Sequence, residues 1–393
     1  MAKVCMISVY HSPLDDRIFY KEALTLQRAG HAVSMICRSD ENGVMYDMGG
    51  SKAINKPGED KCTLEGVTTY AIKTPTTIID KLLKKVLLGS FYKNYVSKAV
   101  EIDADIYHAH EPESFYLGLL ITKQNGAKLV YDAHEAFSGG TLKERWLRFR
   151  YFSQIQYLVA MNDLYRRQYH SKNNNVKSVT IYNAAIQSLF AANVKAPEEN
   201  LQKITFVHEG AILFNRGLKN MLEAFKRVNK RHPDTRLLFI GQAKGEEKEY
   251  IDAFVKTNYL KDVIKVSGWL DFDKVPEKLK CCSVGLIAFE TSAFSFAGPP
   301  IKYFNYTAAG LAIIDLNMPE TSRLINKYNN GVIVTNRTAN ALAEAMCTLV
   351  EDPSILASYQ TNSVEAFKTL NWETEGEKLL KFYENTLLFK ATK

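Results

Sequence analysis

The stretch IYHAHEPESFYLGLLITKQNGAKLVY, residues 106–131, decides the fold. It begins with a short apolar segment, Ile106–Ala109, that is typical of a strand. A helix is expected near Phe115–Gln124, and a second strand pattern follows over Lys128–Tyr131. A strand, a helix and a strand in this order predict a βαβ unit with two parallel strands.

The same alternation extends along both halves of the chain. Strands are expected at Val4–Tyr10 and Ala32–Cys37, with a helix at Arg17–Ala29 between them. The pattern restarts after a polar linker at 191–201. The expected elements are then Ile204–His208, Arg216–Val228, Arg236–Ile240, Val263–Val266, Val284–Ala288, Pro300–Ala309 and Ala312–Ile314. We therefore expect an α/β protein with two doubly wound domains, 1–190 and 202–370, and a C-terminal helix within 371–393.

Composition excludes several classes of protein. The 393 residues suit two domains, and no apolar run reaches the 18 residues of a membrane-spanning helix. The six cysteines include no C-x-x-C pair, and the first residues lack a secretory signal pattern, so we expect a cytoplasmic protein. The net charge is +7, and the basic excess lies in the first half. No nucleic-acid-binding motif accompanies it.

Ligands of open parallel sheets bind beyond the carboxyl ends of the strands, so we expect a site in the cleft between the two domains. The first such loop, 11–17, contains no glycine. This excludes the G-x-G-x-x-G fingerprint of dinucleotide binding there, and no Walker A string occurs. The loop is polar and suits a hydroxyl-rich ligand. Alternatively, Asp15 or Asp16 caps the following helix.

Two further loops place histidine and glutamate at strand ends. The first contains His108, His110 and Glu111, and the second contains His134 and Glu135. Of the two histidines in the first loop, we expect one to face the core and the other the ligand. A buried, hydrogen-bonded role suits His108, and a functional role suits His110.

Two D-x-D strings, Asp103–Asp105 and Asp271–Asp273, raise the question of a metal site. A metal-dependent sugar transferase uses such a pair to bind a divalent cation on a nucleotide diphosphate. There the pair should follow a strand, whereas Asp103–Asp105 precedes one and Asp271–Asp273 lies at a helix start. We interpret both as turn and cap residues, and we expect no metal.

Two basic residues of the second half lie near expected helix starts. Arg216 follows Gly210 in a strand-to-helix connection, and Lys302 lies just after Pro299 and Pro300. A cation in a first turn opposes the helix dipole, and an anionic ligand relieves that cost. The pair suggests a clamp for a diphosphate.

Several strings of the sequence resemble retaining GT-B glycosyltransferases of family 4, in the branch that builds bacterial surface polysaccharides. The matching strings are Asp16-Arg-Ile-Phe-Tyr-Lys-Glu22 with Gly30-His31, His108-Ala-His-Glu-Pro112, Tyr131-Asp-Ala-His-Glu135, Ile181-Tyr-Asn183, Arg216-Gly-Leu218, Lys302-Tyr-Phe-Asn-Tyr-Thr-Ala-Ala-Gly-Leu311 and Trp372-Glu373. The resemblance covers nearly the whole length. It implies the GT-B fold, with two Rossmann-like domains facing a cleft and a C-terminal helix crossing back to the first.

The resemblance also implies a function and its residues. It implies a metal-independent, retaining transfer of a sugar from a nucleotide-diphosphate sugar to a saccharide or lipid-linked acceptor, in lipopolysaccharide, capsule or related synthesis, without a cofactor. The implied residues are His110, Arg216 and Lys302 for catalysis, Gly210, Glu290, Gly298, Pro299 and Asn305 for the donor, and His11, Asp16, Arg17, Glu111, His134 and Glu135 for the acceptor.

The chain departs from the family at the two acids of its E-x7-E string, where Ala297 and Asn305 stand. Two alternatives follow. The chain is a catalytically impaired GT-B protein that binds a sugar nucleotide or a partner, or a GT-B sugar-nucleotide 2-epimerase. A transferase turns over a nucleotide-sugar, whereas an impaired binding protein does not. A transferase also requires an acceptor, whereas a 2-epimerase does not.

Residues 78–100 and 142–159 mix basic and large apolar side chains. Such surfaces dock on anionic membranes, although a helix with one buried and one basic face gives the same pattern. Because lipid-linked acceptors are common in the resembling family, we expect a peripheral contact with the inner face of a membrane.

Overall fold

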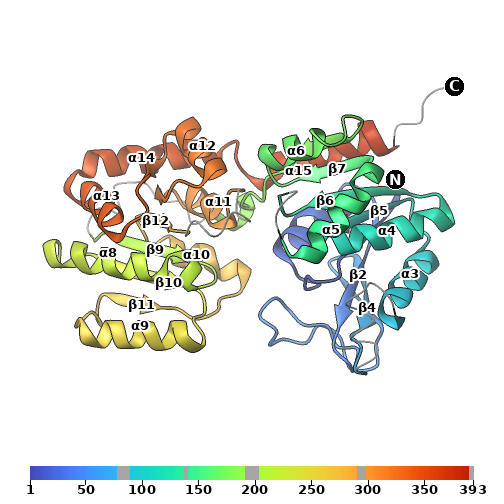
Figure 1. Cartoon of the computed structure of the whole chain (residues 1–393), viewed down its shortest axis with the longest axis horizontal. Coiled ribbons are helices and arrows are strands. Elements are labelled where there is room, and N and C mark those ends of the chain that lie inside the picture. The colour runs from blue at the N-terminus through green and yellow to red at the C-terminus, as the bar shows by residue number, and fades with distance from the viewer. Residues whose placement is uncertain (78–88, 137–139, 191–202, 290–297, 389–393) are drawn as a thin grey trace. The chain divides into compact units, whose positions relative to one another are not determined.

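The computed structural model describes residues 1–77, 89–136, 140–190, 203–289 and 298–388. The chain divides into two compact units. Unit 1 combines Met1–Tyr182 with Glu375–Lys393, and unit 2 is Asn183–Thr374 (Figure 1). The division falls after Tyr182, so residues 183–190 group with unit 2. The expected linker at 191–201 lies outside the described residues.

Unit 1 contains a sheet of eight described strands in the order β3-β4-β2-β1-β5-β6-β7-β8. All neighbours are parallel except the β3–β4 hairpin. The strands are β1 Lys3–Ile7, β2 Ala32–Ser39, β3 Lys61–Leu64, β4 Val67–Lys73, β5 Ile106–His110, β6 Lys128–Ala133, β7 Tyr157–Ala160 and β8 Lys177–Thr180. The helices are α1 Leu24–Arg28, α3 Ser90–Ile102, α4 Glu111–Asn125, α5 Leu142–Tyr151 and α6 Asp163–His170, with a π-helical segment at Asp16–Ala23.

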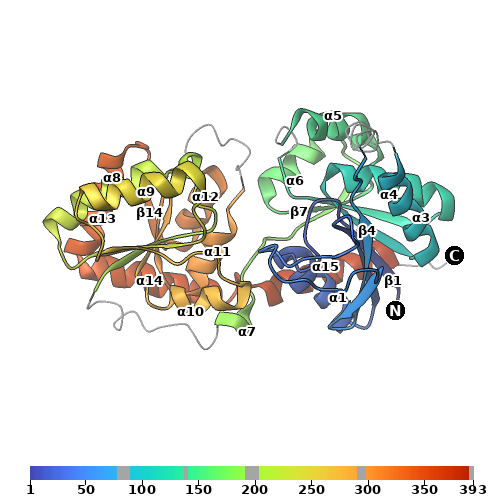
Figure 2. The same ribbon diagram turned by 90° about the horizontal axis from the view of Figure 1, so that it is seen from below.

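Unit 2 contains six described parallel strands in the order β11-β10-β9-β12-β13-β14. The strands are β9 Thr205–Glu209, β10 Arg236–Ile240, β11 Ile264–Val266, β12 Val284–Ile287, β13 Ala312–Asp315 and β14 Gly331–Ile333. The helices are α7 Gln187–Phe190, α8 Leu218–Arg231, α9 Gly245–Thr257, α10 Val275–Leu279, α11 Ile301–Ala308, α12 Pro319–Tyr328, α13 Ala339–Glu351 and α14 Pro353–Phe367. A further helix, α15 Trp372–Phe382, begins at the end of unit 2 and lies mostly in unit 1. Helices α8 and α9 cover one face of the sheet, and α10 and α14 cover the other (Figure 2).

Both sheets reverse their strand order at the first strand of the unit. In unit 1 β1 lies between β2 and β5, and in unit 2 β9 lies between β10 and β12. Ligands of doubly wound sheets bind at such switch points. The arrangement brings the loops after β1 and β5 together in unit 1, and those after β9 and β12 together in unit 2.

The βαβ unit expected from residues 106–131 is confirmed, since β5 pairs in parallel with β6 and α4 connects them. The expected C-terminal helix is confirmed as well. α15 continues into a π-helical segment, Tyr383–Leu388, that belongs to unit 1. There the Tyr383 hydroxyl lies 2.8 Å from Nδ1 of His108.

Some elements differ from expectation. The helix expected from Arg216 begins at Leu218, because Gly217 adopts a left-handed conformation with φ of 82° and ends a separate 3-10 turn. A Cβ at Gly217 would lie 1.8 Å from the carbonyl oxygen of Ala288, so only glycine fits there. The sequence analysis also missed β3, β4, β7, β8 and β14.

The D-x-D strings are turn and cap residues, as expected. Asp103 ends α3 in the left-handed region, and an Asp105 carboxylate oxygen accepts the Lys3 N–H at 2.7 Å. Asp271 precedes the 3-10 turn Phe272–Lys274. No helix of the described residues is long and apolar enough to cross a membrane.

Candidate functional site

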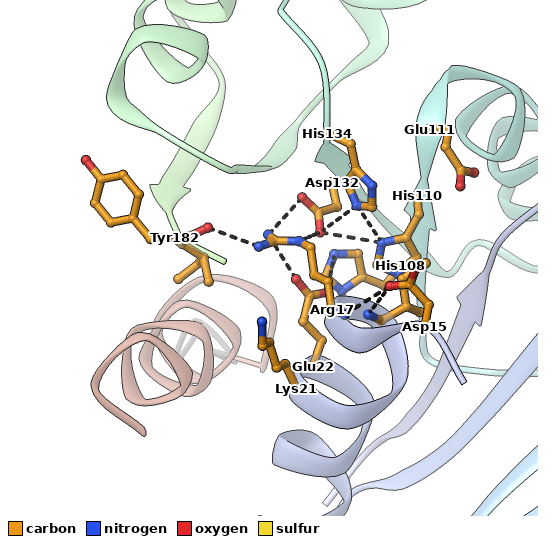
Figure 3. Close-up of polar contacts among 12 residues, drawn as sticks. Asp15, Arg17, Lys21, Glu22, His108, His110, Glu111, Asp132, His134 and Tyr182 are labelled. Atoms are coloured by element: carbon orange, nitrogen blue, oxygen red, sulfur yellow. Dashed lines mark hydrogen bonds and ion pairs between the residues drawn. The ribbon is translucent and has the colours of Figure 1, made fainter. Parts of the chain in front are cut away.

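Arg17 lies at the centre of a buried polar cluster in unit 1 (Figure 3). It is 2% exposed, and its guanidinium donates to both carboxylate oxygens of Asp132, at 2.9 and 3.1 Å. It also donates to the Ile181 carbonyl at 3.1 Å and pairs with Glu22 at 2.9 Å. These contacts make Arg17 a positioning residue of the cluster, and its expected contact with the acceptor stays a prediction.

The two carboxyl groups beside Arg17 differ in protonation. Burial alone would raise the pKa of Asp132, but the Arg17 guanidinium holds it well below its usual range. For Glu22, burial and the neighbouring Asp132 charge raise the pKa well above its usual range. Asp132 is therefore the carboxyl group whose ionised form Arg17 stabilises most, whereas burial and the Asp132 charge disfavour ionisation of Glu22.

His108 and His110 project from β5 to the same side. Their rings stack with centroids 4.8 Å apart and an interplanar angle of 14°. The expectation that one faces the core and the other the ligand is therefore wrong, because residues two apart in a strand share a face. His108 is a fully buried, hydrogen-bonded residue, as predicted.

His110 is held by Asp132 and His134. Its Nδ1 lies 3.4 Å from an Asp132 carboxylate oxygen and 3.3 Å from Nε2 of His134. Burial lowers the pKa of His110, so the ring is neutral. With Nδ1–H donated to Asp132, Nε2 carries a lone pair, and no described residue donates a hydrogen bond to it. This nitrogen can accept a hydrogen bond from a hydroxyl.

Glu111 occupies a strained position directly after His110. Its φ is 64°, in the left-handed region, although it is not glycine. The hydroxyls of Ser8 and Ser114 donate to its carboxylate at 3.1 and 2.8 Å, and His11 Nε2 lies 2.9 Å away. These bonds hold the turn that presents the end of β5.

His11 is a charged link between two carboxylates. Its Nδ1 lies 2.7 Å from Asp15, opposite the contact with Glu111. Burial would lower the pKa of His11, but Glu111 and Asp15 raise it to about 11, so the ring is not a base at neutral pH. The expected helix cap is confirmed for Asp15, whose carboxylate accepts the N–H groups of Arg17 and Ile18 at 3.0 Å.

The remaining expected acceptor residues lie around this cluster. Asp16 pairs with the buried Lys21 at 3.2 Å. His134 is 14% exposed, and burial raises the pKa of Glu135. Unit 1 also contains a cavity of about 490 Å³ that His11 and Asp15 help to line. Its lining includes Tyr10, His11, Ser12, Arg38, Tyr46 and Thr74. Mixed polar and aromatic linings suit hydroxyl-rich ligands.

In unit 2 the structure brings Lys302 and Arg216 together. Lys302 Nζ lies 5.2 Å from the centre of the Phe289 ring, and the Arg216 guanidinium carbon lies 5.7 Å from it. A Cβ at Gly210, where φ is 97°, would lie 3.9 Å from a terminal nitrogen of each. The expected pair of cations therefore converges beside a glycine backbone that a ligand can approach closely.

Lys302 lies in an environment that disfavours its positively charged form. It is 2% exposed on α11, and its Nζ lies 3.2 Å from Nε2 of His208. Burial and then the Arg216 charge lower the pKa of Lys302 to about 7, while Glu209 opposes the shift. Burial and Lys302 lower the pKa of His208, which is neutral. An anion bound here would stabilise the ammonium form.

Asn305 lies one turn after Lys302 on α11, and its Nδ2 donates to a Glu209 carboxylate oxygen at 2.7 Å. Position 305 has no acidic side chain, but the carboxylate of Glu209 lies next to it. Gly298 and Pro299 precede α11. Glu290 and Ala297 lie outside the described residues.

Sequence reasoning missed Asp132, His208, Glu209 and Phe289. Asp132 stands inside the string 131–135 that it singled out. The other three lie at the carboxyl ends of β9 and β12. Because ligands of parallel sheets bind beyond the carboxyl ends of the strands, an inspection of the residues at every strand end would have indicated these three.

One described group of four could offer ligands to a metal. The atoms of Glu22, His108, His110 and Asp132 lie within 4.8 Å of one another. Arg17 already supplies a positive charge to both carboxyl groups.

Three comparisons relate the chain to known proteins. The family model described as glycosyl transferases group 1 matches residues 190–366. The chain is 28% identical over 209 residues to the TuaH protein of Bacillus subtilis, which is named for teichuronic acid biosynthesis. This match covers 52% of the present chain and 50% of the TuaH protein. It is 23% identical over 295 residues to the phosphatidyl-myo-inositol mannosyltransferase of Mycolicibacterium smegmatis, with 72% of each covered.

Among solved structures, the HepE protein of Anabaena in complex with UDP-glucose matches with a TM-score of 0.73 and 13% identity. The match covers 98% of this chain and 100% of that chain. This likeness shows the fold, which is GT-B. The chain spans about half the length of the TuaH protein. The matches confirm the resemblance to GT-B glycosyltransferases that the motifs indicated.

Proposed function

We propose that this chain, which has the GT-B fold and carries a glycosyl transferases group 1 domain over residues 190–366, transfers a sugar from a nucleotide-diphosphate sugar to a saccharide or lipid-linked acceptor. The observation that carries the proposal is the convergence of Arg216 and Lys302 beside Gly210. Two cations with an accessible backbone form a site for the diphosphate of the donor.

The chemistry of the transfer follows from this site. As the bond between the sugar and the diphosphate breaks, negative charge grows on the leaving phosphate, and Arg216 and Lys302 stabilise that charge. The two side chains supply the role that a metal plays in other transferases. The proposal keeps retention at the reacting carbon, with the leaving phosphate accepting the proton of the acceptor hydroxyl on the same face.

Other residues orient the substrates. Glu209 and Asn305 offer acceptor and donor atoms to the hydroxyls of a bound donor, next to the two cations. In unit 1, His110 Nε2 offers a hydrogen-bond acceptor to a sugar hydroxyl, and the cavity beside His11 provides a polar, aromatic wall for an acceptor. UDP is the first nucleotide to test, because the HepE structure is a complex with UDP-glucose.

The proposal includes a role in cell-surface polysaccharide synthesis and a peripheral contact with a membrane. The name of the TuaH protein supports the first, and that of the phosphatidyl-myo-inositol mannosyltransferase supports a lipid-linked acceptor. Of the two expected membrane segments, 78–100 is described only from residue 89, and 142–159 begins with α5.

The alternative of a catalytically impaired binding protein rests on Asn305. The Glu209 carboxylate beside it weakens that alternative, since the acidic charge is present in the site. The 2-epimerase alternative stays open. It is distinguished by turnover of the donor in the absence of any acceptor.

Binding of a nucleotide diphosphate is the first test of the proposal. We expect one of UDP, GDP or ADP, added at about ten times its dissociation constant without metal, to stabilise the protein by about 1.4 kcal/mol. Thermal unfolding should show a rise of roughly 3–5 °C. Arg216→Ala and Lys302→Ala should lose the shift, whereas the exposed Lys248→Ala should keep it. No shift with any nucleotide contradicts the proposal.

The affinity for a nucleotide-sugar is expected to fall as pH rises through 7. Burial and Arg216 lower the pKa of Lys302 to about 7 in the free protein. A bound diphosphate favours the ammonium form, so binding above pH 7 takes up a proton. Titration calorimetry with a UDP-sugar should give a dissociation constant roughly tenfold larger at about pH 8.5 than at about pH 6. Lys302→Arg should bind without this dependence. A constant affinity in the unaltered chain would exclude the assigned role of Lys302.

A further inference from the structure

Helix α5 carries three large apolar side chains on its solvent face. Leu142 is 80% exposed, Trp146 55% and Phe149 70%. Their spacing of four and three residues places them on one side of the helix. The opposite side faces the protein, where Leu147 and Arg148 are buried. Large apolar residues clustered in this way on one exposed helix face mark an interaction surface.

The same face is cationic. Arg145 and Arg150 are exposed beside the apolar side chains, and no described carboxylate pairs with either. The acid of the helix, Glu144, is turned to its N-terminus, where it accepts the Thr141 N–H at 2.6 Å in a capping box. The exposed face of α5 therefore combines apolar side chains with two positive charges.

We propose that α5 docks on an anionic lipid bilayer. Leu142, Trp146 and Phe149 enter the boundary between headgroups and acyl chains, and Arg145 and Arg150 contact lipid phosphates. The charge of the helix face favours an anionic bilayer as the partner, because Arg145 and Arg150 are positive. Arginine and tryptophan side chains also suit the boundary between water and lipid, since each combines an apolar part with a polar end. The ten residues of α5 form a helix of about 15 Å that lies in the plane of the interface.

The inference rests on the membrane contact included in the proposed function, and not on sugar transfer. It assigns that contact to a defined helix face in unit 1. In Figure 2, α5 lies at the edge of that unit. Neither the diphosphate site nor the buried cluster around Arg17 includes any of its exposed side chains.

Co-sedimentation with vesicles tests the surface in the full chain. We expect binding to vesicles of phosphatidylcholine with about 30% phosphatidylglycerol, and much weaker binding to phosphatidylcholine alone. The triple variant Leu142→Gln/Trp146→Gln/Phe149→Gln should lose roughly tenfold or more of the binding. Arg145→Gln/Arg150→Gln should lower binding to the anionic vesicles alone. The matched control is Trp269→Gln, at a tryptophan of unit 2 that is 48% exposed.

Two outcomes overturn the inference. Equal vesicle binding by the triple variant and the unaltered chain would remove α5 from the contact. The second outcome combines two results: the unaltered chain does not bind vesicles, and analytical ultracentrifugation shows a dimer of the unaltered chain that the triple variant does not form. These results would assign the exposed face of α5 to contact with a second copy of the chain. The nucleotide-induced thermal shift, measured on the same variant, reports folding and donor binding separately. A retained shift with lost vesicle binding supports the inference whether or not transfer is observed.

Discussion

Arg17→Met is expected to destabilise unit 1 by about 3–5 kcal/mol. The substitution keeps most of the apolar volume of the side chain but removes the charge that pairs with Asp132 and Glu22. Asp132 is fully buried, and its ionised form would have no cation in contact. It also leaves the Ile181 carbonyl without its donor from Arg17. Calorimetry should show that the midpoint temperature of unfolding of unit 1 is lower by roughly 10 °C or more.

Two further variants control this result. Arg28→Met removes an arginine that is 67% exposed and pairs with Glu65 at 3.7 Å, and it should change stability by less than about 1 kcal/mol. Arg17→Met/Asp132→Asn removes both charges, so part of the lost stability should return. A stability within about 1 kcal/mol of the unaltered chain for Arg17→Met would show that the buried cluster does not depend on this charge.

Lys302→Met is expected to lower kcat/KM for sugar transfer by roughly 100- to 1,000-fold. The ammonium lies in the proposed diphosphate site, where negative charge increases in the transition state. The same substitution should stabilise the free protein by about 1–4 kcal/mol, because it removes a buried cation whose pKa is lowered to about 7 by burial and Arg216. Activity and stability therefore move in opposite directions.

Steady-state kinetics and thermal unfolding measure the two effects on one preparation. Lys302→Arg keeps a positive charge and should retain more activity than Lys302→Met. The exposed Lys327→Met should change neither quantity beyond experimental error. If Lys302→Met transfers sugar at the normal rate, the diphosphate does not bind at this lysine, and the assignment of the donor site is wrong.

The fold was predictable because its signals are local. Short apolar segments, separated by helical periodicity, appear directly in the sequence, and β5, α4 and β6 lie where residues 106–131 predict them. The missed elements lack this signal. β8 and β14 contain no fully buried side chain, so their sequences lack the apolar run of a buried strand.

The site was predictable only in part, because its contacts join distant segments. Arg17, in the π-helical segment Asp16–Ala23, contacts Asp132 near the end of β6, and the two residues are 115 positions apart. The sequence marked both strings but could not pair them, so it did not indicate that Arg17 is buried. Asn305 likewise looked like a lost acid, since Asn305 lies on α11 and its partner Glu209 lies at the end of β9, 96 positions earlier.

Unit 1 is discontinuous in the chain, since Tyr383 contacts His108 and Glu375 accepts the Tyr182 N–H at 3.0 Å after the whole of unit 2 has intervened. A ribosome therefore releases all of Asn183–Thr374 before the last part of unit 1 exists. Unit 2 can complete its sheet during translation, whereas the buried histidine cluster of unit 1 waits for the final helix. Until then the nascent chain exposes the part of unit 1 that Tyr383 and Leu387 cover in the folded protein, and chaperones bind such transiently exposed surface.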